Sequence, residues 1–415
     1  MKRIITTASI AALGAVGLQA AYAPGLTSQE SSKWWSVSLA LRGFYDDNYT
    51  TLPSNLGKRD SFGVVVSPSV EARYVADATM ASLGYTYGMY WYEDRDSNSA
   101  DHTHQIDARL NHAFSDSYRL DVSDSFVISQ EPAIQGGGQR IRINGNNIRN
   151  LGNIVLTGDF TPTLGFDIGY ANNLYNYDDK KAAQYTYLDR IEHYPHLNLR
   201  YRVSPQTVAL LGYQYGFVDH TNDGDPSWIN VIGPADSRNA RIHYFYAGVD
   251  HGFTSDLVGA LRLGAQNIKY PDADQAAPGL PITDDSRWAP YADASLSYTY
   301  MAGSVAKLGV RYTRQESEYM QALDEQATTV YGDITHKLTA KLTGKLLVQY
   351  THASFNEGIY DDDSEDYVVV GLNLAYQISQ YLAADVGYNF DDLSSDVTGR
   401  SYDRNRVYVG LIASY

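Results

Sequence analysis

Apolar and polar residues alternate with a period of two along most of the chain, from residue 34 to the C-terminus. In the segment 340–350, Leu346, Val348 and Tyr350 share one parity, and Lys345 has the other. Because successive side chains of a strand point to opposite faces, this period predicts strands with one apolar face. Eighteen such strands are expected, over residues 35–46, 62–75, 79–92, 103–114, 117–128, 147–160, 164–176, 184–203, 207–219, 239–253, 257–270, 287–301, 304–316, 326–338, 340–354, 365–377, 380–391 and 402–415.

The connections between these strands alternate in length. Every second connection is a tight turn, such as Ser115-Asp116 or Ala302-Gly303, and the others are longer. Short turns on one rim and long loops on the other, with both termini on the short-turn side, are typical of bacterial single-chain barrels. The expected fold is all-β: a single transmembrane antiparallel β-barrel of about 18 strands, with 16 as the alternative, short periplasmic turns and long extracellular loops.

Aromatic residues of the apolar face collect near the strand ends. Near the short turns lie Tyr74, Phe114, Phe160, Tyr201, Tyr300, Tyr376 and Tyr415, and near the long loops lie Tyr45, Trp91, Phe126, Tyr170, Phe217, Tyr312, Tyr350 and Phe390. Side chains with an apolar body and a polar tip suit the boundary between lipid tails and headgroups. The apolar face is therefore expected to point outward to lipid and the polar face into the lumen.

Composition excludes several classes of protein. The 415 residues include 32 basic and 48 acidic side chains, a formal net charge of −16, and no cysteine. A nucleic-acid-binding protein needs a basic face, and disulfide scaffolds or cysteine-ligated metal sites need cysteine. With a mean hydropathy of −0.35, the chain is also not a bundle of membrane helices.

The N-terminal segment has the pattern of an export signal. Lys2 and Arg3 precede an apolar stretch that ends at Leu18, and Ala21-Tyr22-Ala23 supplies an A-x-A cleavage site. We therefore expect a signal peptide over residues 1–23, a short periplasmic segment over 24–34 and the outer-membrane β-barrel over 35–415.

The C-terminal Tyr415, preceded by alternating apolar residues, resembles the C-terminal signal of outer-membrane barrels. The mature chain as a whole resembles the beta-barrel porin families of Gram-negative bacteria. This resemblance implies a location in the cell outer membrane, with membrane lipid and lipopolysaccharide as neighbours and the barrel-assembly machinery as the partner during insertion. It brings no catalytic motif, and it leaves open whether the barrel forms a homo-oligomer.

Charged residues of the polar face are candidates for the lumen wall. Near mid-height they are Arg42, Asp107, Arg109, Asp121, Asp167, Arg262, Asp293, Arg311, Asp333, Lys345 and Asp385. They could create a field that orients polar solutes, or pair across strands and stabilise the wall, because isolated charges there would be costly. Arg311, Asp333 and Lys345 lie on three consecutive strands and could form such a ladder, and Arg109 with Asp121 a smaller one.

The long loops are mostly acidic. The acidic groups are Asp361 to Asp363 with Glu365 and Asp366, Asp272 with Asp274, Asp284 with Asp285, and Asp391 with Asp392. None of these segments has the ordered ligands and glycine of a calcium-binding loop. A solvated acidic rim would concentrate cations and repel anions, so we expect a preference for cations.

The sequence contains no enzyme signature: G-x-S-x-G, H-E-x-x-H and the P-loop are all absent. His112, His336 and His352 are expected on the outer face, where some outer-membrane lipases place a histidine, but their belt height favours an ordinary interfacial role. His102 and His104 beside Asp101 are a weak metal signal. We expect no enzymatic activity, no cofactor and no metal.

The expected function is a porin-like channel for passive diffusion of small polar solutes, because eighteen strands leave an aqueous lumen. The alternatives are an export or binding barrel for a polysaccharide or sugar, and a structural barrel plugged by its loops. An aromatic track would favour the sugar pathway, and the tyrosines expected to face inward are Tyr90, Tyr92, Tyr291, Tyr331, Tyr367, Tyr381 and Tyr408.

The loop 129–146 differs from the other long loops. Gly136 to Gly138 give it backbone freedom, and Arg140 and Arg142 make it basic. As the third long loop it resembles, in position, the loop that general porins fold into the lumen. Arg140 and Arg142 are therefore constriction candidates; the alternative is an external loop or an extension of the sixth strand.

Overall fold

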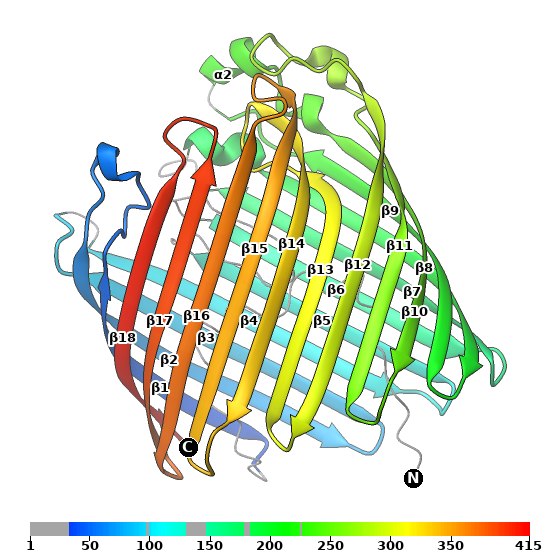
Figure 1. Cartoon of the computed structure of the whole chain (residues 1–415), viewed down its shortest axis with the longest axis vertical. Coiled ribbons are helices and arrows are strands. Elements are labelled where there is room, and N and C mark those ends of the chain that lie inside the picture. The colour runs from blue at the N-terminus through cyan, green and yellow to red at the C-terminus, as the bar shows by residue number, and fades with distance from the viewer. Residues whose placement is uncertain (1–32, 97–98, 130–146, 178–182, 225) are drawn as a thin grey trace.

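In the computed structural model, eighteen antiparallel strands close into one barrel (Figure 1). The structure describes residues 33–415 apart from 97–98, 130–146, 178–182 and 225, so the expected signal peptide lies outside the described residues. The strands are β1 (Trp35–Asp46), β2 (Ser61–Ala76), β3 (Thr79–Tyr92), β4 (Ala100–Ala113), β5 (Tyr118–Ser129), β6 (Asn147–Asp159), β7 (Leu164–Tyr177), β8 (Arg190–Ser204), β9 (Thr207–His220), β10 (Ala240–Gly252), β11 (Leu257–Lys269), β12 (Ser286–Met301), β13 (Ser304–Glu316), β14 (Ala322–Lys337), β15 (Leu342–Gly358), β16 (Ser364–Ser379), β17 (Leu382–Ser395) and β18 (Tyr402–Ser414).

Each strand pairs with its neighbours in the chain, and β1 pairs with β18 from Ser38↔Ser414 to Asp46↔Arg406. This last pairing closes the sheet, so the barrel has no free edge. The expected fold and the count of eighteen are confirmed, and the alternative of sixteen strands is wrong.

The connections differ between the two rims, as expected. Turns of two to four residues join the strands at the lower rim in Figure 1, whereas the upper rim carries the long loops. The helices in these loops are α2 (Pro226–Ile232) and the 3-10 helices η2 (Ser54–Leu56), η3 (Ala183–Leu188), η4 (Ala235–Arg238) and η5 (Ala273–Gln275). None of the described helices is long and apolar enough to cross a membrane.

The two faces of the wall have opposite character. Leu41, Leu211 and Val409 expose 52, 63 and 64 % of their surface, whereas Arg42 and Asp385, on the other face, expose 4 and 2 %. Exposed apolar area of this extent would destabilise a protein in water, but it is favourable against lipid tails. The apolar side chains therefore face the membrane, and the polar side chains face the lumen.

The expected aromatic belts are present at the wall's two boundaries. Tyr74, Tyr201 and Tyr415 are largely exposed near the short turns, and Trp91 is exposed near the long loops. Tyr381, which we expected to face inward, is a correction: its ring lies 5.8 Å from that of Tyr415, and 49 % of its surface is exposed. Tyr381 belongs to the turn between β16 and β17, where strand parity does not apply.

The topology can be tested by surface labelling of single-cysteine variants, because the natural chain has no cysteine. Asp362→Cys, in the long loop between β15 and β16, is expected to react with a membrane-impermeant maleimide on intact cells. Pro205→Cys, in the tight turn between β8 and β9, is expected to react only after the outer membrane is permeabilised. The reverse pattern would show that the barrel is inserted upside down relative to this assignment.

Candidate functional site

Ion pairs between strands line parts of the inner wall. Nε of Arg42 on β1 lies 2.9 Å from Oδ2 of Asp385 on β17, and both side chains are buried. The strand between them, β18, contributes Gly410, whose position is opposite both residues. A Cβ atom on Gly410 would lie 2.4 Å from Cγ of Arg42, so the glycine gives the arginine room to cross the strand.

A second group of charges runs across four consecutive strands. Asp250 on β10 lies 2.6 Å from Nη2 of Arg262 on β11. Arg262 is opposite Asp293 on β12, and Asp293 in turn lies 2.9 Å from Nε of Arg311 on β13. Signs alternate along this ladder, so each charge has an opposite charge beside it and the cost of removing it from water is offset.

Further ion pairs lie toward the two rims. Oδ1 of Asp167 lies 3.0 Å from Nε of Arg200. Near the long loops, Oδ2 of Asp46 on β1 accepts from both Arg404 and Arg406 on β18. The sequence reasoning missed Asp46, Arg200 and Asp250 because it considered mid-height residues, although the same parity would have placed them on the inner face.

Two of the expected contacts are wrong. Arg311 pairs with Asp293 rather than with Asp333, and Lys345 lies opposite Thr335 and Asn373. The strand register decides this, because it brings Lys307 and not Arg311 opposite Asp333.

The smaller ladder, Arg109 with Asp121, does not form either. Asp121 bonds to Arg119 and Asn111, while Arg109 lies opposite Ser123 and is exposed. Asp107 accepts hydrogen bonds from Gln105 and Ser125.

Long loops narrow the interior on one side of the barrel. Tyr187 of η3, Ile232 of α2 and Leu280 of the β11–β12 loop form one buried cluster with inward side chains of β10 such as Ile242 and Tyr244. Loops that pack on the inner face of a wall reduce the cross-section of the lumen. The upper part of Figure 1 shows this group of loops above β9 to β14.

The loop 317–321, between β13 and β14, reaches the far wall. Met320 packs against the cluster just described and also against a second cluster, in which Leu188 of η3 joins Leu151 on β6 and Tyr175 and Tyr177 on β7. The strands β6 and β13 are far apart around the sheet, so this loop crosses the interior. The long loops therefore form a constriction at the extracellular end.

Arg238 of η4 holds this constriction together. Its side chain is fully buried, and its two terminal nitrogens donate to the carbonyl oxygens of Ser317, Tyr319, Met320, Ala322 and Leu323. A guanidinium with its fixed fork of donors can satisfy several carbonyls that face one point. No periodic pattern marks a loop residue of this kind, so it could not be recognised from the sequence.

A tyrosine on the β11–β12 loop adds a further contact. The hydroxyl of Tyr270 donates to Asp324, whose carboxylate also lies 2.6 Å from Nε of Arg314. Burial raises the pKa of the Tyr270 hydroxyl well above its ordinary value, so the hydroxyl stays protonated and remains a donor. The contact joins this loop to the first residues of β14.

The loop with Arg140 and Arg142, the constriction candidates from the sequence, lies outside the described residues. Its role in the constriction stays a prediction.

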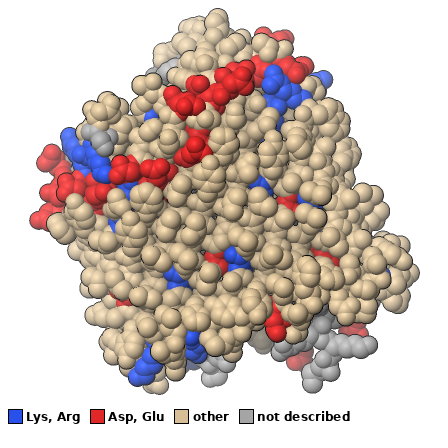
Figure 2. Space-filling view, viewed as in Figure 1, with Lys and Arg blue, Asp and Glu red and all other residues tan. Residues whose placement is uncertain are grey.

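The upper rim is acidic (Figure 2). Among the described residues, Asp274, Asp285, Asp361 and Asp362 are exposed and none of them forms an ion pair. Asp391 and Asp392, expected in a long loop, are instead the last part of β17, and Asp391 is buried. The rim charge therefore comes from the loops β11–β12 and β15–β16 more than from β17.

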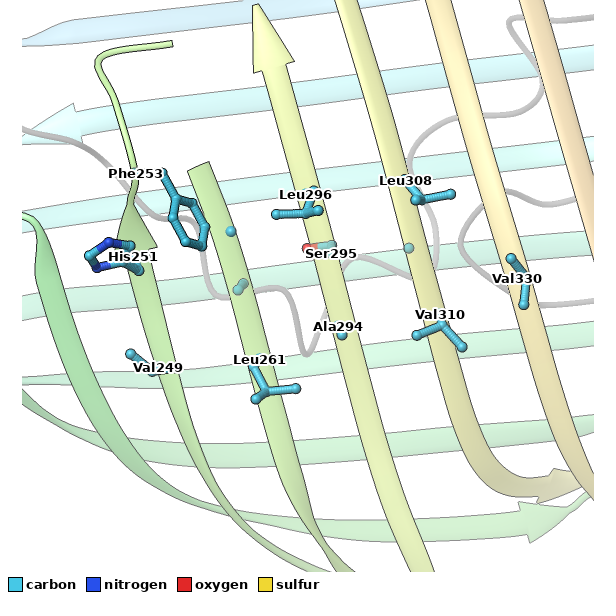
Figure 3. Close-up of a pocket in the computed structure, with 13 residues that line it drawn as sticks. Val249, His251, Phe253, Leu261, Ala294, Ser295, Leu296, Leu308, Val310 and Val330 are labelled. Carbon is cyan, nitrogen blue, oxygen red and sulfur yellow. The ribbon is translucent and has the colours of Figure 1, made fainter. Parts of the chain in front are cut away.

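The hollow in Figure 3 lies on the lipid-facing side of the wall. Its volume is about 420 Å³, and it is lined by Val249, Leu261, Leu296, Leu308 and Val310 with their neighbours on β10 to β14. These side chains belong to the apolar outer face. The hollow is therefore a groove for lipid tails and not part of the pathway through the barrel.

The outward histidines bond to hydroxyl groups on other strands, either the next strand or the next but one. Nδ1 of His112 lies 2.8 Å from Oγ1 of Thr79, and Nδ1 of His336 lies 2.8 Å from the Tyr300 hydroxyl. His102 and His104 bond to Tyr87 and Tyr85 in the same way. These are interfacial contacts.

His352 bonds to Asp366 at 2.9 Å. Within the described part of the chain, no group of three or more histidine, aspartate or glutamate side chains is arranged to hold a metal ion.

The buried ion pair between β1 and β17 yields a stability prediction. Asp385→Asn leaves the Arg42 guanidinium buried without a counter-charge, so the free energy of unfolding is expected to fall by about 3 kcal/mol. The double variant Arg42→Met with Asp385→Leu is expected to recover most of that loss. Denaturant unfolding in detergent micelles measures both. Asp333→Asn, with no ion pair in the described structure, is the control, and an equal loss there would contradict the assignment.

The role of Arg238 can be tested by conductance. Arg238→Met keeps the length of the side chain but removes all five hydrogen bonds, so the loop 317–321 is expected to leave the interior and the single-channel conductance to rise. Lys341→Met, on the short-turn rim, is the matched control and is expected to leave conductance unchanged. A folded Arg238→Met protein with the natural conductance would show that this loop does not constrict the lumen.

Comparisons with known proteins give the following similarities. No curated protein matches the sequence. Among solved structures, the outer membrane protein OpdK of Pseudomonas aeruginosa is 13 % identical, with 92 % of this chain and 99 % of that chain covered and a TM-score of 0.44. A BenF-like porin of Pseudomonas fluorescens Pf-5 is 12 % identical, with 92 % and 99 % covered and a TM-score of 0.46.

These solved structures are too distant to support an assignment. The family described as Putative beta-barrel porin 2 matches residues 36–415, which is nearly the whole barrel. Porins are channels of the outer membrane and not enzymes. The match therefore agrees with the expected outer-membrane channel and with the expectation that the protein is not an enzyme. The chain belongs to the beta-barrel porin 2 family of outer-membrane barrels.

Proposed function

We propose that this porin is a passive diffusion channel for small polar solutes and that it prefers cations. The observation that carries the preference is the difference between wall and rim. Much of the wall charge is neutralised in pairs, such as Arg42 with Asp385, whereas Asp274, Asp361 and Asp362 on the rim have no basic partner in the described structure.

An acidic mouth raises the local concentration of cations. The field of paired wall charges falls off quickly, because each positive charge has a negative charge within hydrogen-bonding distance. Unpaired carboxylates around one mouth instead add to a single negative potential, which attracts cations and repels anions. The rim thus supports a cation preference, and the constriction of the long loops brings solutes close to it.

Three of the inward tyrosines give little support to a sugar pathway, whereas Tyr90, Tyr291 and Tyr331 are half-buried. Tyr92, Tyr367 and Tyr408 expose 0, 3 and 7 % of their surface. A sugar ring stacks on an accessible aromatic face, and these rings are covered by their neighbours in the wall. A channel without a dedicated aromatic track remains the function that the geometry favours.

Selectivity is tested by the reversal potential across a planar bilayer in a KCl gradient. The natural protein is expected to prefer K⁺ over Cl⁻, and the preference is expected to weaken at 1 M salt, where charges are screened over about 3 Å instead of about 10 Å at 0.1 M. The variant Asp274→Asn, Asp285→Asn, Asp361→Asn, Asp362→Asn is expected to lose most of the preference.

The matched control carries Asp77→Asn and Asp116→Asn, which change exposed carboxylates on the short-turn rim. It is expected to retain more of the preference than the long-loop variant. Anion preference in the natural protein would refute the proposal and would point to the wall arginines as the controlling charges. A protein with no conductance steps would favour the plugged barrel.

A further inference from the structure

Within the described strands, an arginine and a lysine on the outer face of the barrel lie side by side. Strand parity directs Arg241 on β10 and Lys269 on β11 outward, with the exposed Phe245 and Leu263. The other lysines and arginines within the described strands have the inward parity, except Arg314 on β13, whose side chain is buried against Asp324. Arg241 and Lys269 are opposite each other in the antiparallel register, so the two outward cations form a single cross-strand pair.

The surroundings of the pair leave it a net positive charge. The Arg241 guanidinium lies 3.8 Å above the Phe217 ring, its Nη1 donates to the carbonyl oxygen of Val218, and its Nη2 lies 3.1 Å from Oδ1 of Asp219. These contacts fix the guanidinium against the wall. Lys269 is exposed and has no ion pair in the described structure. Two cations thus face one carboxylate.

The pair lies just above a cluster of aromatic side chains. Arg241 and Lys269 are near the long-loop ends of their strands. Below them, the Phe245 ring stacks with His243 and Trp288, at centroid distances of 6.3 Å in both cases. Trp288 exposes 66 % of its surface. Aromatic belts mark the boundary between lipid tails and headgroups, so the cations are at the level of the headgroups in the outer leaflet.

We propose that Arg241 and Lys269 bind a phosphate group of lipopolysaccharide in the outer leaflet. Because Nη1 of Arg241 already donates to two backbone carbonyl oxygens and Nη2 contacts Asp219, the arginine contributes mainly a fixed positive charge. The Lys269 ammonium beside it adds a second positive charge with free donors, and the two together attract a phosphate. The rim above the pair is acidic and repels an anionic headgroup. A local pair of cations on the lipid-facing wall overcomes this repulsion at one place, which sets where a phosphorylated lipid contacts the barrel.

The aromatic cluster below completes the surface. Trp288 and Phe245 offer exposed ring faces to the saccharide and to the first carbons of the acyl chains. This inference depends on the outer-membrane location and on the direction of the side chains, and not on conduction. The channel can fail the selectivity test while the lipid site remains, and the reverse also holds.

The test is native mass spectrometry of the purified full-length barrel in detergent, with added diphosphorylated lipid A. The double variant Arg241→Gln with Lys269→Gln is expected to bind this lipid about tenfold more weakly, because two exposed charge contacts are lost. Lys341→Gln, an equally exposed lysine on the short-turn rim, is the matched control and is expected to bind like the natural protein.

Two further measurements distinguish a phosphate site from a general affinity for lipid. Lipid A without phosphates is expected to bind the natural protein as weakly as the double variant binds the phosphorylated form. The exchange variant Arg241→Lys with Lys269→Arg keeps the charge and is expected to retain most of the binding. Equal binding of phosphorylated lipid A by the natural protein and by a folded double variant would overturn the proposal.

Discussion

Backbone amide and carbonyl groups that enter the hydrocarbon layer must find hydrogen-bond partners within the protein, because lipid offers none. A sheet meets this requirement only when its first and last strands pair. Here β1 and β18 pair over nine positions, from Ser38↔Ser414 to Asp46↔Arg406. Closure fixes the register of every strand, and the register fixes which side chains face lipid, because a shift of one residue would turn them all over.

The inner wall follows from closure. Once β18 lies between β17 and β1, Arg42 and Asp385 are brought together across Gly410, although 343 residues separate them in the chain. The ladder from Asp250 to Arg311 forms in the same way on the opposite wall. Pairing of this kind offsets the cost of removing the wall charges from water.

The constriction departs from the simple rule of an apolar outside and a polar inside. Near the long loops, the inward side chains of β10 and β11 include Ile242, Tyr244 and Ile268, which would be unfavourable against water. The loops cover these side chains. Arg238 satisfies the carbonyl groups that the loop 317–321 and the start of β14 bring inside. The same apolar patch that draws the loops inward therefore narrows the lumen.

The sequence by itself determined the strands, their number, the alternation of turns and loops, and the face on which residues such as Arg42 and Leu41 lie. These properties are local: period two and turn residues act within a few positions of the chain. Only the tertiary structure decided the partners. Parity placed Arg311 and Asp333 on one face but could not give the register that pairs Arg311 with Asp293.

Contacts between loops could not be predicted from the sequence at all. Arg238 and its carbonyl partners have no repeating pattern, and they meet only when the barrel has closed. Side-chain direction depends on the nearest peptide units, and partner choice depends on the whole sheet. That difference in range is why the sequence determined the faces of this barrel and the folded chain determined its contacts.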